Sequence, residues 1–241
     1  AAEGVRQGLR GLRLTGGDGR LLAVAGRAAE RGGVERLPSA AQQNVPAWAL
    51  FGVFFIAVPL AGTLIHERDS GLSLRLRILP QSSLTLLAGR LAAYQLVCLG
   101  QFGLILVIGR WLLPILGAPA LEVAGRTGPA LLVLVSAAAA AAGFGVLLGS
   151  AARTYQQASM FGALAVVVAA ALGGVMVPVF AMPEAMRAVS RFSPLAWGLE
   201  GLLEVFVRGG GVAEVLPQAG RLLLFAAGAV GLAAALGRRR I

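Results

Sequence analysis

The residues His66-Glu67-Arg68-Asp69-Ser70-Gly71 separate two long apolar stretches of this sequence. The stretch before them, Val45–Ile65, contains no charged residue, and a second charge-free stretch, Leu91–Gly109, begins soon after them. About 20 apolar residues are needed to cross the ~30 Å hydrocarbon layer of a membrane. The polar segment between the two stretches therefore predicts an elbow at a membrane surface, where a partner in water could contact it. We call residues 66–90 the elbow.

Five stretches without a charged residue approach or exceed the length of a membrane-spanning helix. Hydrophobic residues make up 57% of the chain and charged residues 13%, about half of the ~25% typical of soluble domains, and the mean hydropathy is +0.80. One such stretch could be the core helix of a soluble protein, but five together favour a membrane protein. The stretches are Val45–Ile65, Leu91–Gly109, Thr127–Ala152, Thr154–Pro183 and Leu222–Gly237.

The sequence therefore predicts an all-α, polytopic membrane protein with five transmembrane helices in residues 45–241. Pro59 is expected to kink the first helix. The fifth stretch reaches membrane length if Arg221 extends its side chain to the interface or if Leu216–Gly220 joins it. Residues 1–44 are expected to be the C-terminal remnant of an extracytoplasmic domain, which implies a sixth, earlier helix that is missing from this sequence.

The charged residues argue against several other functions. The net charge is +10, and the 21 residues counted as Lys or Arg are all arginines. A P-loop needs a lysine, so the chain is not expected to bind ATP and Mg or to be an enzyme that hydrolyses ATP. The arginines are scattered among the loops, which disfavours nucleic-acid binding. None of the five stretches contains a carboxylate, which disfavours an ion-coupled carrier, and His66 alone cannot form a metal site.

Two patterns predict that the elbow faces the cytoplasm. Arginines close to the ends of transmembrane helices mark the cytoplasmic side, and tryptophans gather at membrane interfaces. The face of the elbow would hold Arg68, Arg75, Arg77, Arg90, Arg153 and Arg238–Arg240, and the opposite face would hold Trp48, Trp111 and Trp197. We therefore expect a cytoplasmic C-terminus and an extracytoplasmic N-terminal segment.

Two polar segments are expected to form short helices outside the membrane core. In the elbow, Leu72, Leu76 and Leu79 would share one stripe of an interfacial helix, which either anchors the loop or docks to a cytoplasmic partner. Residues 182–217 are expected to form an outer helical hairpin with helices at 183–192 and 195–207. On the second of these, Glu200 and Glu204 share a face, which is either a wetted surface or a rim that attracts cations.

Two motifs resemble those of ABC-2 type exporter permeases. The first is Glu67-Arg68-Asp69-x-Gly71-x-x-x-Arg75-Leu76-x-x-x-Pro80, followed by Leu87-x-Gly89-Arg90-Leu91. The family has Glu-Arg-Glu-x-Gly-Thr-Leu-x-Arg-Leu in its cytoplasmic loop, so this chain departs from it at Asp69 and at Leu72-Ser73. The second is Gly173-Gly174-x-Met176-x-Pro178, then Met182-Pro183, then Ser193-Pro194-Leu195-x-Trp197-x-x-Glu200-Gly201, which is similar to the stretch between the family's last two helices.

The resemblance implies a multi-pass permease of the bacterial plasma (inner) membrane that forms a homodimer in lipid and exports its substrate. Two separate ABC ATPase subunits would carry the ATP and Mg, and each would dock on a cytoplasmic coupling helix in the elbow. The implied ATPase-coupling residues are Glu67, Arg68, Asp69, Gly71, Arg75 and Pro80. The implied outer gate or hairpin residues are Gly173, Gly174, Pro178, Pro183, Ser193, Pro194, Trp197, Glu200 and Glu204.

The residues by themselves leave two alternative functions open. The chain could be an ion-coupled or passive membrane carrier, or a non-transporting membrane anchor or assembly protein. A carboxylate in the middle of a transmembrane stretch would have favoured a carrier. A separate ATPase that works with the chain would favour the exporter.

Overall fold

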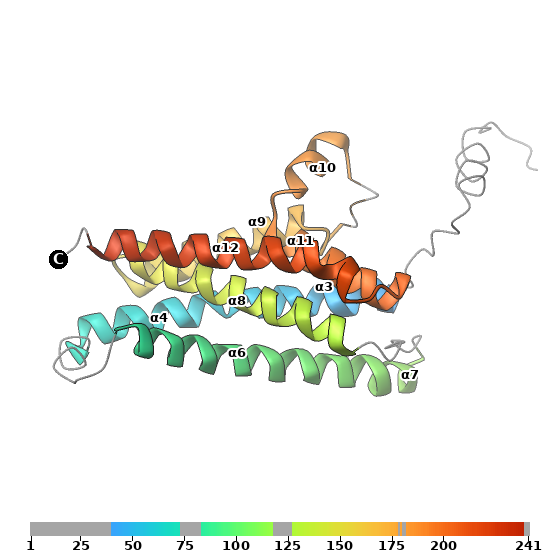
Figure 1. Cartoon of the computed structure of the whole chain (residues 1–241), viewed down its shortest axis with the longest axis horizontal. Helices are drawn as coiled ribbons and strands as arrows, with labels where there is room; N and C mark the ends of the chain where they lie inside the picture. Colours follow the sequence, from blue (N-terminus) through green and yellow to red (C-terminus); the bar gives the residue numbers. More distant parts are fainter. Residues whose placement is uncertain (1–39, 73–82, 118–126, 178, 180–181, 239–241) are drawn as a thin grey trace, which may run out of the picture. The chain divides into compact units, whose positions relative to one another are not determined.

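The computed structural model describes residues 40–72, 83–117, 127–177, 179 and 182–238. Within these ranges every regular element is a helix, and five helical segments are long and apolar enough to cross a membrane (Figure 1). The predicted all-α fold with five candidate transmembrane helices is therefore confirmed. The helix expected in the elbow falls largely on residues 73–82, and the expected N-terminal domain falls mostly on residues 1–39, so both lie outside the described residues.

The first transmembrane segment consists of α3 (Ala40–Phe55) and α4 (Ala57–Asp69), which are separated at Ile56. The cause of the break is Pro59, because a proline has no amide hydrogen and its ring clashes with the carbonyl group four residues earlier, that of Phe55. The Ile56 amide instead donates to Val53 O at 3.3 Å, and the helical pattern resumes when the Leu60 amide donates to Ile56 O at 3.1 Å. The expected kink thus lies one turn before the proline.

The other four segments differ from the charge-free stretches in where they begin or end. The second contains α6 (Ser83–Val107), a π-helical turn η1 (Ile108–Leu112) and α7 (Leu113–Ile115), the third is α8 (Thr127–Ala151), the fourth is α9 (Tyr155–Leu172) and the fifth is α12 (Val212–Arg238). Helix α12 begins well before Leu222, so Leu216–Gly220 does join the last segment. Pro217 lies inside this helix.

Helix α9 ends at Leu172, well before the end of the charge-free stretch Thr154–Pro183. Gly174 has a φ of +87°, a left-handed conformation that ends helices and that glycine adopts without steric cost. A Cβ atom on Gly173 would lie 2.6 Å from Ala169 O and 2.9 Å from Leu195 Cβ. The chain therefore turns immediately after α9 because two glycines permit the close approach.

Short helices α10 (Glu184–Ser190) and α11 (Pro194–Leu203) follow this turn, and a π-helical turn η3 (Glu204–Arg208) continues α11. Leu195 and Leu202 of α11 are fully buried. Helix α11 therefore packs into the bundle, whereas α10 projects from it (Figure 1). The two short helices expected between the last two transmembrane segments are therefore present, and they lie in different environments.

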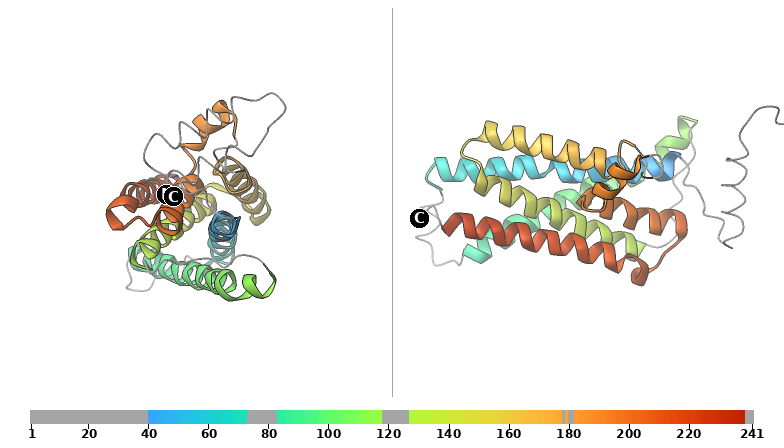
Figure 2. Two further views of the ribbon diagram at one scale, coloured as in Figure 1. Left: turned by 90° about the vertical axis from the view of Figure 1, so that its right-hand side faces the viewer. Right: turned by 90° about the horizontal axis from the view of Figure 1, so that it is seen from above.

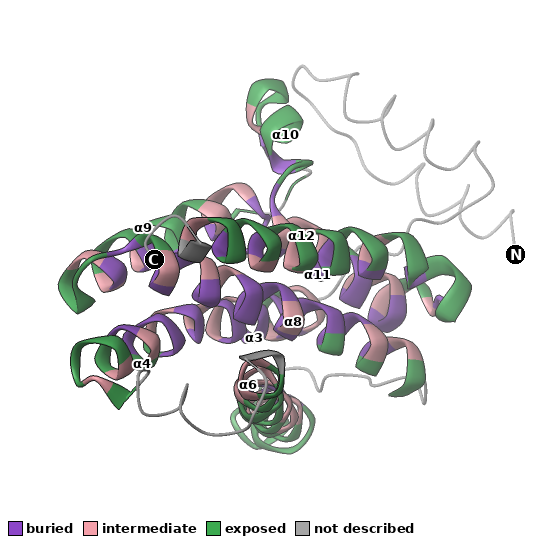
Figure 3. Cartoon of the chain, turned by 60° about the vertical axis from the view of Figure 1, so that its left-hand side comes forward, coloured by how far each residue is buried: buried purple, intermediate pink, exposed green. Residues whose placement is uncertain are grey.

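Helix α8 lies at the centre of the bundle, and its contacts with its neighbours depend on glycine. A Cβ atom on Gly145 would lie 3.0 Å from both the Cα and the O atom of Ala57 in α4, and one on Gly149 would lie 3.1 Å from Ala61 Cα. On another side, a Cβ on Gly143 would lie 3.0 Å from Ala226 O in α12. Figure 3 shows that α8 is mostly buried, whereas α6 is mostly exposed or intermediate.

The segments alternate in direction, so that the bundle has two distinct ends (Figure 1; Figure 2, right). The end of α4, the start of α6, the turn between α8 and α9, and the end of α12 share one end, which we call the elbow end. Seen along the helices, α6 and α9 lie at different edges of the bundle (Figure 2, left). The arrangement brings the end of α4 close to the α8–α9 turn.

We expect Gly145→Leu to separate α4 from α8 and to destabilise the folded protein in detergent, because the added side chain would meet the backbone of Ala57. Overpacking of this kind costs about 1–3 kcal/mol, so the midpoint of thermal unfolding should fall. Gly228→Leu is the matched control, because nothing lies within 4 Å of a Cβ atom at that position of α12. Equal midpoints for the two variants would show that close backbone packing contributes little.

Candidate functional site

An ion pair joins the two ends of the elbow. Arg90, near the start of α6, donates through Nη2 to the Oε2 atom of Glu67, near the end of α4. The side chains are 26% and 21% exposed, respectively, so water and salt screen this pair less than a fully exposed one. The contact fixes the start of α6 against the end of α4. The carboxylate group of Glu67 is therefore directed toward α6.

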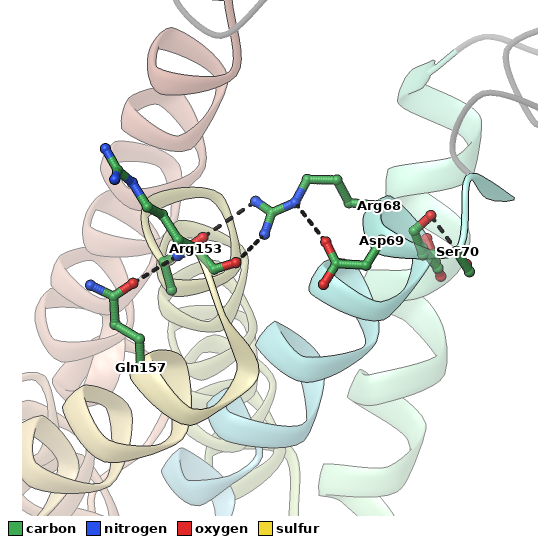
Figure 4. A network of polar contacts seen from close by, with 7 residues as sticks. Arg68, Asp69, Ser70, Arg153 and Gln157 are labelled. Carbon is green, nitrogen blue, oxygen red and sulfur yellow. Dashed lines mark hydrogen bonds and ion pairs between the residues drawn. The ribbon is translucent and has the colours of Figure 1, made fainter.

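Arg68 bridges from the end of α4 to the α8–α9 turn, residues 152–154 (Figure 4). Its Nη1 atom donates to Ala152 O at 3.3 Å, and its Nη2 atom donates to Arg153 O at 2.8 Å. Its Nε atom also pairs with the Oδ1 atom of Asp69 at 3.4 Å. The carbonyl groups at the end of a helix lack partners within that helix and carry partial negative charge. The positive guanidinium group satisfies two such carbonyl groups just after α8.

The α8–α9 turn has its own hydrogen bonds, which shape it for these contacts. Thr154 is the N-cap residue of α9 and accepts a hydrogen bond through Oγ1 from the Gln157 amide at 3.2 Å. The side chain of Gln157 in return accepts from the Arg153 amide at 2.8 Å. The pattern is that of a capping box, displaced by one residue on the return bond. It holds the carbonyl group of Arg153 in a defined position.

Helix α4 also contacts the first residue of α9 through an aromatic ring. A Cβ atom on Gly62 would lie 2.6 Å from the Cε2 atom of Tyr155, so the ring lies directly on this glycine. Thr63 follows Gly62 in the chain, and its Oγ1 atom lies 3.3 Å from the hydroxyl oxygen of Tyr94 in α6. The last two turns of α4 therefore contact α6, α8 and α9.

Gly71 ends α4 with a φ of +70°, and nothing lies within 4 Å of a Cβ atom at this position. The constraint here is on the backbone conformation and not on space. Residues other than glycine adopt a positive φ only with strain. The Gly71 amide donates to Arg68 O at 3.3 Å, and the Ser70 side chain donates to Glu67 O at 3.4 Å. Arg75 and Pro80, which the resemblance also assigns to the coupling site, lie outside the described residues.

The predicted outer-gate residues gather where α9 ends and α11 begins. Ser193 donates through Oγ to Ala169 O at 2.9 Å, and Trp197 donates through Nε1 to Arg191 O at 2.7 Å. Pro194 occupies the first turn of α11, and Pro183 precedes α10. Gly173 and Gly174 form the tight turn described above, and Pro178 lies outside the described residues. These contacts fix the hairpin to the end of α9.

The two glutamates predicted to share a face, Glu200 and Glu204, have different surroundings. Glu204 forms an ion pair with Arg208 at 2.7 Å, and its side chain is 19% exposed, whereas Glu200 is exposed. The charge of Glu204 is therefore neutralised locally, which weakens the interpretation of this face as a cation-attracting rim. Within the described parts of the chain, no three His, Cys, Asp or Glu side chains gather in a way that could hold a metal ion.

Several residues of the elbow end were not singled out from the sequence. No contact was predicted for Thr154, Tyr155 or Gln157, although the Thr-x-x-Gln spacing of a capping box is visible there. Arg90 was predicted to belong to a motif and to the arginines of the elbow face, but no partner was assigned to it. The contact of Arg68 with the α8–α9 turn carries no sequence signal, because its acceptors are backbone carbonyl groups.

Comparison with known proteins agrees with these features. The family model described as ABC-2 type transporter matches residues 26–207. The chain is 31% identical over 182 residues to the linearmycin resistance permease protein LnrN of Bacillus subtilis (strain 168), and the alignment covers 73% of this chain and 45% of that protein. The chain thus spans less than half the length of this relative. With its five apolar helices and an elbow that matches the family motif, the chain belongs to the ABC-2 type transporter family.

Proposed function

We propose that this chain is the permease subunit of an ATP-driven exporter in the bacterial plasma membrane. A separate ABC ATPase subunit docks on residues 66–90 from the cytoplasm, and its nucleotide-driven closure moves the transmembrane helices. A second copy of the permease completes the membrane part of the transporter. The relative's name describes a resistance permease, which supports outward movement of the substrate.

The observation that carries this proposal is the way the elbow is attached to the bundle. The Glu67–Arg90 pair holds the two ends of the elbow together, and Arg68 joins the same segment to the α8–α9 turn. The charge-free stretches contain no carboxylate that could couple transport to protons or ions. In this proposal the energy for transport comes from a partner outside the membrane core, and the elbow is the segment through which the partner moves the helices.

The side chains that point outward from the end of α4 are candidates for direct contact with the ATPase. His66, Asp69 and Ser70 are exposed, and the Asp69 side chain is 61% exposed. Arg68 is exposed as well, with 40% of its side chain accessible, but its charged group, like that of Glu67, is directed toward other parts of the chain. In this proposal Glu67 and Arg68 hold the elbow in shape, and the outward residues meet the partner together with the segment that follows Gly71.

A tagged version of the chain, purified from membranes in mild detergent, should copurify with a P-loop ATPase. The complex should hydrolyse ATP in a vanadate-sensitive reaction, and the chain freed of its partner should not, because it contains no lysine for a P-loop. The measurement is ATP turnover together with identification of the copurified protein by mass spectrometry. Hydrolysis by the isolated chain, or purification without any ATPase, would contradict the proposal.

Exchanging the charges of the elbow pair tests whether the pair supports docking. Glu67→Arg and Arg90→Glu should each lower the amount of copurified ATPase by about tenfold, which corresponds to ~1.4 kcal/mol, because each leaves two like charges in contact. The double variant restores an opposite pair and should recover most of the bound ATPase. Permease abundance and elution volume are measured in parallel. If the single variants bind the ATPase normally, the pair has no role in docking.

Labelling of single cysteines tests the proposed orientation. With the buried Cys98 replaced by alanine, a cysteine introduced at Ser70 should react with a membrane-impermeant thiol reagent only after the cells are permeabilised. A cysteine introduced at Val212, which is 52% exposed at the other end of the bundle, should react in intact cells. Val212 is a better probe than the adjacent glycines, since Gly210 is buried against the side chain of Glu204. The reverse labelling pattern would place the elbow outside and exclude cytoplasmic docking.

A further inference from the structure

We infer that Arg68 is the positioning residue that transmits movement of the elbow to the α8–α9 turn, so that α8 and α9 move with the end of α4. This inference rests on the proposed function, because it concerns how work from the ATPase reaches the helices. It assigns to Arg68 a role inside the permease that is distinct from contact with the partner.

The first support is the geometry of the guanidinium group. Arg68 reaches two successive carbonyl groups, those of Ala152 and Arg153, through two different nitrogen atoms at 3.3 and 2.8 Å. A planar group that donates to two acceptors fixes orientation as well as distance. Asp69 holds the third nitrogen from the side of α4 at 3.4 Å. The turn cannot rotate or slide along α4 without breaking these bonds.

The second support is that the same turn is held again, two residues later. The ring of Tyr155 lies on Gly62, so closely that a Cβ atom there would be 2.6 Å away. Gly62 lies almost two helical turns before Arg68. The Tyr155–Gly62 contact and the Arg68 hydrogen bonds therefore attach residues 152–155 to two different positions along α4. The capping hydrogen bonds of Thr154 and Gln157 make the segment between these two contacts stiff.

The third support is the position of α8 within the bundle. The C-terminal third of α8 contacts the backbone of α4 at Gly145 and Gly149, and Gly143 contacts Ala226 of α12. A displacement of the end of α8 is therefore passed on to α12 by direct backbone contact. Helix α6 is attached differently, through the Glu67–Arg90 pair and the side chain of Gln95, which donates to Val135 O at 3.0 Å.

Arg153 supplies a matched control for Arg68. It lies in the same turn and carries the same charge, but its hydrogen bonds to described residues use only its backbone N and O atoms, and Figure 4 shows its side chain directed away from Arg68. Arg68→Gln and Arg153→Gln therefore remove one positive charge each from the same end of the bundle. Only the first removes the two bonds to the turn.

The experiment measures movement at two places in the same complex. An environment-sensitive fluorophore is attached to a cysteine introduced at Ser70, in the elbow, or at Met160, which is 63% exposed on α9, with Cys98 replaced by alanine. The permease is studied with its copurified ATPase, and Mg–ATP with vanadate traps the closed ATPase. The parent and Arg153→Gln should show a fluorescence change at both positions. Arg68→Gln should keep the change at Ser70 and lose most of the change at Met160.

Each other outcome has a definite meaning. If Arg68→Gln keeps the full change at Met160, Arg68 does not transmit movement, and the inference is wrong while the proposed function stands. If it loses the change at both positions, Arg68 acts in docking, which also overturns the inference. If the parent shows no change at either position although the ATPase is bound, the proposed function fails.

Arg68→Lys keeps the test decisive if Arg68→Gln does not accumulate in membranes. A lysine retains the charge but cannot donate to two acceptors from a planar group, so the change at Met160 should lie between that of the parent and zero. Arg153→Lys should match the parent. Identical signals from the two lysine variants would contradict the inference.

Discussion

The structure depends on the close approach of α4 and α8. Inside a membrane, apolar side chains gain little by leaving lipid for protein, so helices are held together by van der Waals packing and by hydrogen bonds between them. Gly145 and Gly149 allow the backbone of α8 to reach Ala57 and Ala61 of α4. The elbow continues directly from α4. Any movement of the elbow therefore acts on α4 and α8, the pair of helices at the centre of the bundle.

The polar contacts at the elbow end hold the helices together in addition to this packing. Glycine packing holds the helices side by side through close backbone contact. Hydrogen bonds and ion pairs are directional, so they also fix how the helices are placed along and around their axes. The Glu67–Arg90 pair acts between α4 and α6, and the Arg68 bonds act between α4 and the α8–α9 turn. Both lie at the water-facing end, where charged groups cost least to accommodate.

Much of the fold could be predicted from the sequence, because membrane helices are marked by the absence of charge over about 20 residues. The ends of the helices were harder to predict. Helix α9 stops at Leu172 although no charge follows it, because two glycines turn the chain, and α12 runs past Arg221 and Pro217. Charge marks where a chain leaves the hydrocarbon layer, but local backbone conformation decides where a helix stops.

The candidate site was predictable in part. The elbow motif pointed to Glu67, Arg68 and Gly71, and the structure places the first two in contacts with other segments and gives the third a positive φ. Their partners could not be inferred from the sequence. Arg90 is one of many arginines, and nothing in its neighbours distinguishes it as the partner of Glu67. Tyr155 contacts a glycine, which has no side chain to suggest a match.

The acceptors of Arg68 have a consequence for how this protein can vary. Both are main-chain carbonyl groups, which every amino acid possesses, so residues 152 and 153 can change in identity without removing the bonds. Substitution at Arg68 therefore has no compensating substitution in the turn. Across a set of related sequences, position 68 would vary independently of the turn that it holds, and methods that detect contacts from correlated changes would not reveal this one.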